Sequence, residues 1–140
     1  MNLSKIASLI IPLLAVLIFN TGCIEKSIPV FPKAKSGTID LSQWDFDKNG
    51  SVTLEGEWDF YWNQFLSYEE IIEKKRSIDA YLKVPGSWKG VQLGKSVLPG
   101  DGFSTIHLLV QMPEDSKDLV IKTPEIGTSY KLWINEKLIH

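Results

Sequence analysis

Three oxygen-bearing side chains have a spacing close to that of a calcium-binding loop. Asp45, Asp47 and Asn49 fall at the first, third and fifth positions, and a glycine follows at the sixth. Carboxylate and amide oxygens at alternate positions are the ligands of such loops. The twelfth position, where a bidentate glutamate closes the coordination sphere, is Gly56. The pattern therefore favours a tight turn, and calcium held by these three residues and Glu55 is the weaker alternative.

The other residues able to do chemistry are scattered along the chain. His107 lies in a strand-like pattern and His140 is the last residue, so the histidines do not have a metal-binding spacing. Ser87 lacks the glycine two positions later that a nucleophile elbow needs. Cys23 is the single cysteine, which excludes an intrachain disulfide. We therefore expect no catalysis and no cofactor.

Cys23 ends a segment that is typical of exported lipoproteins. Lys5 precedes an apolar run at residues 6–19, which is short for a membrane span and suits a signal peptide. Small residues stand just before the cysteine, as in a bacterial lipobox, although Asn20 occupies a position that prefers leucine. We expect a lipoprotein signal peptide at residues 1–22, acylation of Cys23, and a membrane-anchored location in the cell envelope, on the periplasmic or outer-surface side. An uncleaved N-terminal anchor is the alternative.

The charge of the chain excludes nucleic acid as a partner. The formal net charge is −2, and the only cationic run, at residues 74–76, follows three glutamates. Such a run is typical of the solvated end of a helix rather than a binding patch. Residues 23–36 contain two prolines and no periodicity, and we expect them to form a tether. Residues 37–140 are long enough to form one domain with a core.

The residues after the tether have the pattern of short β-strands. Trp58, Phe60 and Trp62 alternate with polar side chains and share one strand face, which predicts a core. Residues 63–76 repeat apolar side chains at helical spacing and predict one amphipathic helix. Other expected extended segments are residues 41–46, 52–54, 81–84, 106–112, 119–122 and 129–134. Short strands with frequent turns and one helix favour an antiparallel β-sandwich.

The motifs along these segments resemble a known family. They are GTIDLS at 37–42, Trp44, GEWDFYW at 56–62, VPGSW at 84–88, GFST at 102–105 and YKLWIN at 130–135. Together they resemble the extracytoplasmic sensory module of bacterial seven-transmembrane receptors with diverse intracellular signalling domains. They are more loosely similar to the sugar-binding jelly-roll domain of family 2 glycoside hydrolases. The resemblance covers residues 37–138 and implies a galactose-binding-like jelly roll that senses a carbohydrate or another small periplasmic ligand.

Two residues are candidates for binding that ligand. Trp88 lies in a loop motif, where its ring could stack on a sugar, although packing is the plainer interpretation. His107 stands where the family often has arginine, and Asn135-Glu136 replaces the usual Asn-Gly hairpin. In the family, further strands follow this hairpin, so we expect a sandwich that is incomplete at its C-terminus.

The early end leaves three functions open. The chain is expected to be the sensory front end of a truncated receptor. The alternatives are the accessory sugar-binding domain of a truncated family 2 glycoside hydrolase and a free-standing envelope lipoprotein. A protein partner could supply the strands that the sheet lacks, because open sheet edges pair readily with other chains.

Overall fold

The computed structural model describes residues 30–116 and 118–139 of the chain. The expected signal peptide at residues 1–22 and the acylation site Cys23 lie outside the described residues. A compact unit begins at Phe31, and Ala34, which the sequence analysis places in the tether, is buried in it. The backbone N–H of Ala34 donates to the carbonyl of Glu55. The last residues of the expected tether therefore pack with the β-strands.

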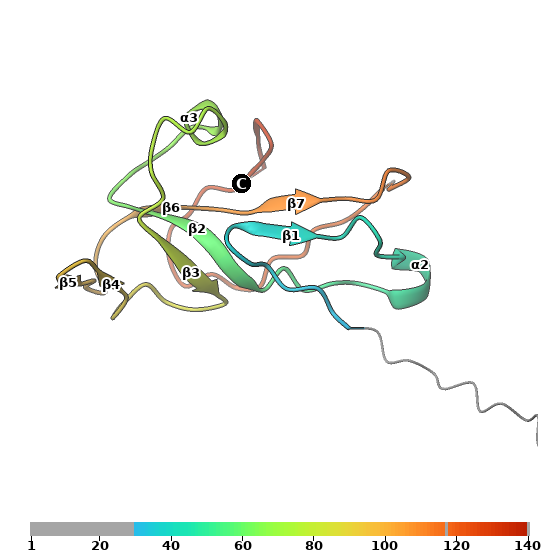
Figure 1. Cartoon of the computed structure of the whole chain (residues 1–140), viewed down its shortest axis with the longest axis horizontal. Helices are drawn as coiled ribbons and strands as arrows, with labels where there is room; N and C mark the ends of the chain where they lie inside the picture. The colour runs from blue at the N-terminus through green and yellow to red at the C-terminus, as the bar shows by residue number, and fades with distance from the viewer. Residues whose placement is uncertain (1–29, 117, 140) are drawn as a thin grey trace, which may run out of the picture. The chain divides into compact units, whose positions relative to one another are not determined.

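Strand β2 (Gly56–Trp62) is the centre of a three-stranded antiparallel sheet with β3 (Ala80–Val84) and β6 (Ser104–His107) (Figure 1). The strand order is β3-β2-β6. As the alternation predicts, Phe60 is fully buried on one face, with Trp62 packed beside it. The opposite face is also covered, because Asp59 and Tyr61 are buried as well. Strand β2 therefore has a hydrophobic core on one side and buried polar groups on the other.

A second, two-stranded sheet pairs β1 (Thr38–Asp40) with β7 (Leu109–Gln111) in parallel. The expected strand at 106–112 is divided at Leu108 into β6 and β7, which lie one after the other in Figure 1, β6 beside β2 and β7 beside β1. The leucine itself packs on the core beneath β1. The division therefore passes the chain from one sheet to the other.

Two clusters of buried side chains form the core. One contains Ala34, Ile39, Leu41 and Trp44, and Val52 and Leu54 pack against it from a segment without strand structure. The other contains Phe60, Leu82 and Leu98. Leu98 follows a short antiparallel hairpin of β4 (Gln92–Leu93) and β5 (Ser96–Val97). The described residues therefore form a mainly β fold with antiparallel pairing in the larger sheet, as expected.

The helix expected over residues 63–76 is much shorter than the periodicity predicts. Helix α3 spans only Tyr68–Ile72. Asn63 has a φ of 53° and donates its N–H to the Phe103 carbonyl, which ties this end of the segment to the β6 side of the sheet. Ser67 then begins the helix through a capping box with Glu70. The sequence contains this Ser-x-x-Glu signal, which marks the helix start better than the apolar spacing does.

The segment expected to be extended at 41–46 is instead a turn followed by a helix. The Trp44 N–H donates to the Leu41 carbonyl, and Asp45 then caps the short helix α2 (Phe46–Asn49). The tight turn that the calcium-loop pattern favours is the end of this helix, where Gly50 has a φ of 73°. The Asp45 carboxylate accepts the backbone N–H of Lys48, which is how aspartate commonly caps the start of a helix.

The expected strands at 119–122 and 129–134 are largely absent. Of these residues only Trp133–Ile134 form a strand, β8, which pairs with β9 (Lys137–Leu138). Val120 is 90% exposed, and an apolar β-branched pattern makes a strand only when a neighbouring strand takes its hydrogen bonds. Within residues 30–116 and 118–139, the helices are too short to cross a membrane.

Candidate functional site

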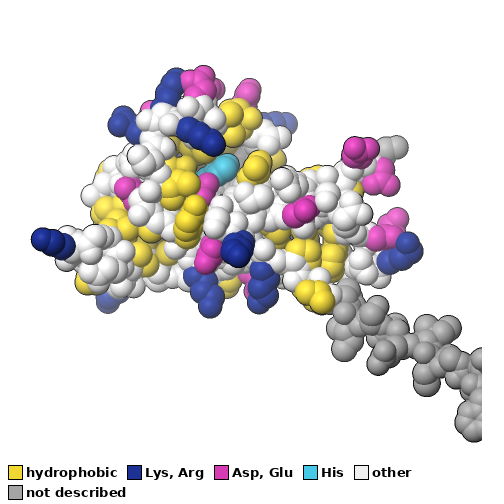
Figure 2. All heavy atoms as spheres, viewed as in Figure 1, with side chains coloured by type: hydrophobic (Ala, Val, Ile, Leu, Met, Phe, Trp, Pro, Cys, Tyr) yellow, Lys and Arg dark blue, Asp and Glu magenta, His cyan; other side chains and the backbone are white. Residues whose placement is uncertain are grey.

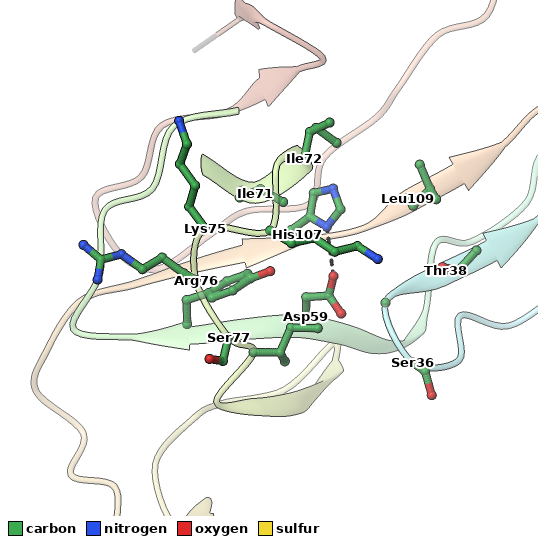
Figure 3. Close-up of a pocket in the computed structure, with 14 residues that line it drawn as sticks. Ser36, Thr38, Asp59, Ile71, Ile72, Lys75, Arg76, Ser77, His107 and Leu109 are labelled. Atoms are coloured by element: carbon green, nitrogen blue, oxygen red, sulfur yellow. Dashed lines mark hydrogen bonds and ion pairs between the residues drawn. The ribbon is translucent and has the colours of Figure 1, made fainter. Parts of the chain in front are cut away.

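The register of the three-stranded sheet places Asp59 of β2 opposite His107 of β6. Directly opposed residues of an antiparallel pair share a face, so the two side chains meet. Asp59 Oδ2 lies 3.0 Å from His107 Nδ1. Asp59 is 8% exposed, and His107 is less deeply covered. Figure 3 shows the imidazole above the carboxylate, with the ring directed toward Ile72 of α3.

The second oxygen of the Asp59 carboxylate faces the backbone of Gly37. Among the described residues, Asp59 Oδ1 is buried without a hydrogen-bond partner. Gly37 has a φ of 73°, and a Cβ built there would collide with the Asp59 carboxylate. The backbone of Gly37 is held on both sides, because its N–H donates to Glu57 and its carbonyl accepts from Leu109. Only glycine suits both the conformation and the close approach.

A cavity of about 590 Å³ opens above the Asp59–His107 pair. This volume is in the range of pockets that hold small ligands. The lining has three kinds of side chain. Hydroxyls come from Ser36, Thr38, Tyr61 and Ser77, apolar groups from Ile71, Ile72, Ile78 and Leu109, and positive charges from Lys74, Lys75 and Arg76. In the space-filling view the histidine, in cyan, lies between hydrophobic side chains, with cationic side chains of the α3 region above it (Figure 2).

Tyr61 supplies a protonated hydroxyl to the cavity. Burial raises the pKa of the Tyr61 phenol above its ordinary value, and the negative charge of Asp59 adds a smaller effect in the same direction. Both causes disfavour the phenolate. Tyr61 therefore remains a hydrogen-bond donor throughout the physiological range.

The chemistry of this arrangement is that of an oriented imidazole. A carboxylate that accepts from Nδ1–H fixes the ring and leaves Nε2 for another partner. Asp59 also lines the cavity, but its carboxylate is mostly covered by the histidine and by the backbone of Gly37. The imidazole, the hydroxyls and the cations are thus the groups that a bound molecule would meet.

The structure separates the two residues predicted to bind ligand. His107 lines the cavity, whereas Trp88 packs on the opposite core of Phe60 and Leu82. The Trp88 ring lies 5.9 Å from the Trp62 ring, and its Nε1–H donates to the Gly100 carbonyl. These contacts give Trp88 a packing role, and we do not place it in the cavity.

The residues of the alternative calcium site have other contacts. Asp45 accepts hydrogen bonds from the backbone and the ammonium group of Lys48, and Glu55 forms an ion pair of 2.7 Å with Lys33. Asp47 lies in the first turn of α2, and Asn49 ends that helix. Across residues 30–116 and 118–139, no three His, Cys, Asp or Glu side chains form a metal-binding group.

Sequence reasoning missed Asp59, Gly37 and the cationic residues as parts of one site. Aspartate is disfavoured in the middle of strands, so Asp59 within an aromatic strand is a usable signal. Its pairing with His107 depends on the register, which the sequence does not contain. No protein-family model, curated protein or solved structure matches this chain.

Proposed function

We propose that this chain is a non-catalytic ligand-sensing module, exported and anchored to the membrane through its N-terminus. The cavity above Asp59 and His107 is its binding site, and a carbohydrate or another small hydroxylated solute is the ligand. The observation that carries the proposal is the buried pair itself. Burial of a carboxylate beside an imidazole that faces an open cavity lowers the free energy of unfolding. A role in ligand binding explains why the fold keeps such an arrangement.

The finer architecture belongs to the same proposal. We take the two sheets, joined by the β6–β7 chain, as parts of a galactose-binding-like sandwich of the kind found in bacterial receptor sensory modules. The division of the chain at Leu108 supports this, because a strand that leaves one sheet for another is typical of two-layer β folds. The motifs at 37–42 and 56–62 bring Gly37 and Asp59, respectively, to the cavity.

Calorimetric titration of the full chain with monosaccharides and disaccharides tests this function. We expect one ligand to bind at a single site, and the His107→Leu variant to bind it at least about tenfold more weakly, equivalent to about 1.4 kcal/mol. Ser96→Ala, on an exposed hairpin away from the cavity, is the matched control and should bind like the wild type. Equal affinity in His107→Leu and wild type would contradict the assignment of the site.

A protein partner is a second candidate, which the C-terminal surface favours. Large apolar side chains are at least half exposed at Val120, Ile121, Trp133, Leu138 and Ile139, and surfaces of this kind mark interaction sites. Sedimentation velocity at rising concentration should show association that a Val120→Asp variant weakens. A single monomer peak at all concentrations would leave no support for self-association of this surface.

A further inference from the structure

The cavity is more positive than the protein that contains it. The whole chain has a formal net charge of −2. The cavity lining nevertheless brings together Lys74, Lys75 and Arg76, against Asp59 as the single carboxylate. Asp59 is already paired with His107. A cavity lined by one sign of charge concentrates ligands of the opposite sign.

Within the described residues, the three cations are not equally available to a ligand. Lys75 forms an ion pair of 2.6 Å with Glu73. Figure 3 shows the charged ends of Lys75 and Arg76 directed away from the Asp59–His107 pair. Lys74 also lines the cavity, and no carboxylate of residues 30–116 and 118–139 pairs with it. Lys74 is therefore the ammonium group that remains for a bound anion.

The backbone at Lys74 has a conformation that glycine normally supplies. Helix α3 ends at the cap Glu73, and Lys74 follows with a φ of 51°. The N–H of Lys75 donates to the Glu70 carbonyl and that of Lys74 to the Ile71 carbonyl. This is the Schellman pattern, in which glycine is strongly preferred at the residue with positive φ. A strained lysine beside a cavity is consistent with a functional role for its side chain.

We infer that the ligand of this cavity carries an anionic group on a hydroxylated frame, and that Lys74 binds the anion. The inference rests on the proposed function and adds the class of ligand to it. Thr38 and Tyr61, which line the cavity, carry hydroxyls for the frame, and His107 contributes its remaining ring nitrogen. A carboxylate and a phosphate share the chemistry that this site would recognise.

Titration of the full chain with glucose, glucuronate and glucose 6-phosphate tests the inference. We expect at least one of the two anions to bind about tenfold or more tightly than glucose. Tighter binding of glucuronate than of glucose 6-phosphate would identify the anionic group as a carboxylate. The reverse order would identify it as a phosphate. This preference should weaken as ionic strength rises.

Three variants test whether Lys74 is the residue that binds the anionic group. Lys74→Gly should abolish the preference for the anion without strain, because glycine suits this backbone. Lys74→Arg should keep it, and Lys95→Gln, which removes a lysine from the exposed β4–β5 turn outside the cavity, should also keep it. Glucose that binds as tightly as both anions would overturn the inference and leave the proposed function intact. If none of the three compounds bound, the inference would fall, and failure of the wider sugar panel would separately remove the proposed function.

Discussion

At the scale of single residues, the cavity depends on contacts that a sequence does not display. Asp59 and His107 are 48 residues apart, and only the strand register brings them to 3.0 Å. Gly37 is needed where it is because the Asp59 carboxylate occupies the space that a side chain would fill. The sequence predicts that Asp59 and Tyr61 share a face of the strand, but alternation alone assigns that face to solvent.

Tyr61 gives a prediction about stability at alkaline pH. Because burial raises the pKa of Tyr61 in the folded protein, the folded state holds the phenol proton more tightly than the unfolded chain does. The stabilisation from this residue is complete below the ordinary pKa of about 10 and is lost as pH rises above it. Urea unfolding over this range should therefore show a steeper fall in stability for the wild type than for Tyr61→Phe. Parallel pH profiles would contradict the assigned burial of the phenol.

At the scale of the elements, strands β2 and β3 were predictable, whereas the length of helix α3 and the absence of most of the expected C-terminal strands were not. Aromatic alternation identifies β2, and β3 falls where its short apolar run predicts it. Helix α3 is shorter than its apolar period because the capping box begins it at Ser67 and the turn at Lys74 ends it. Residues 119–122 have strand-like composition, but in the described chain they have no ladder partner.

Helix α3 should matter both to the stability of the domain and to binding. Ser67 accepts the N–H of Glu70 and completes the capping box. Ser67→Ala should lower the free energy of unfolding by about 1 kcal/mol. It should also weaken binding of an anionic ligand, because the helix positions Lys74. Thermal unfolding and titration of the same variant measure both effects. Unchanged anion affinity in a clearly destabilised variant would show that α3 does not position the binding group.

At the scale of the whole molecule, the proposed function requires an N-terminal anchor joined to a domain that contains the cavity. The described residues form the domain and its cavity, and the sequence pattern that ends at Cys23 predicts the anchor. The mainly β class follows from strand periodicity. The sandwich and the sensory role depend instead on motifs, whose meaning comes from resemblance rather than from local physical chemistry.

Acylation of Cys23 has a direct cellular test. A clickable fatty acid supplied to expressing cells should label the wild-type protein and leave the Cys23→Ala variant unlabelled. The variant should still reach the envelope fraction if the signal segment directs export. Label that persists without Cys23 would show that the lipid is elsewhere or that the segment is not a lipoprotein signal.

The most direct test of the central claim is an imidazole NMR titration of the full chain labelled with ¹⁵N-histidine. Only two histidines are present, so the signals of His107 and His140 can be assigned from a His140→Gln variant. A ligand found by calorimetry should shift the His107 ring nitrogens saturably, with the calorimetric dissociation constant. Calorimetric binding that leaves the His107 ring signals unmoved would place the ligand elsewhere and contradict the assignment of the cavity as the binding site.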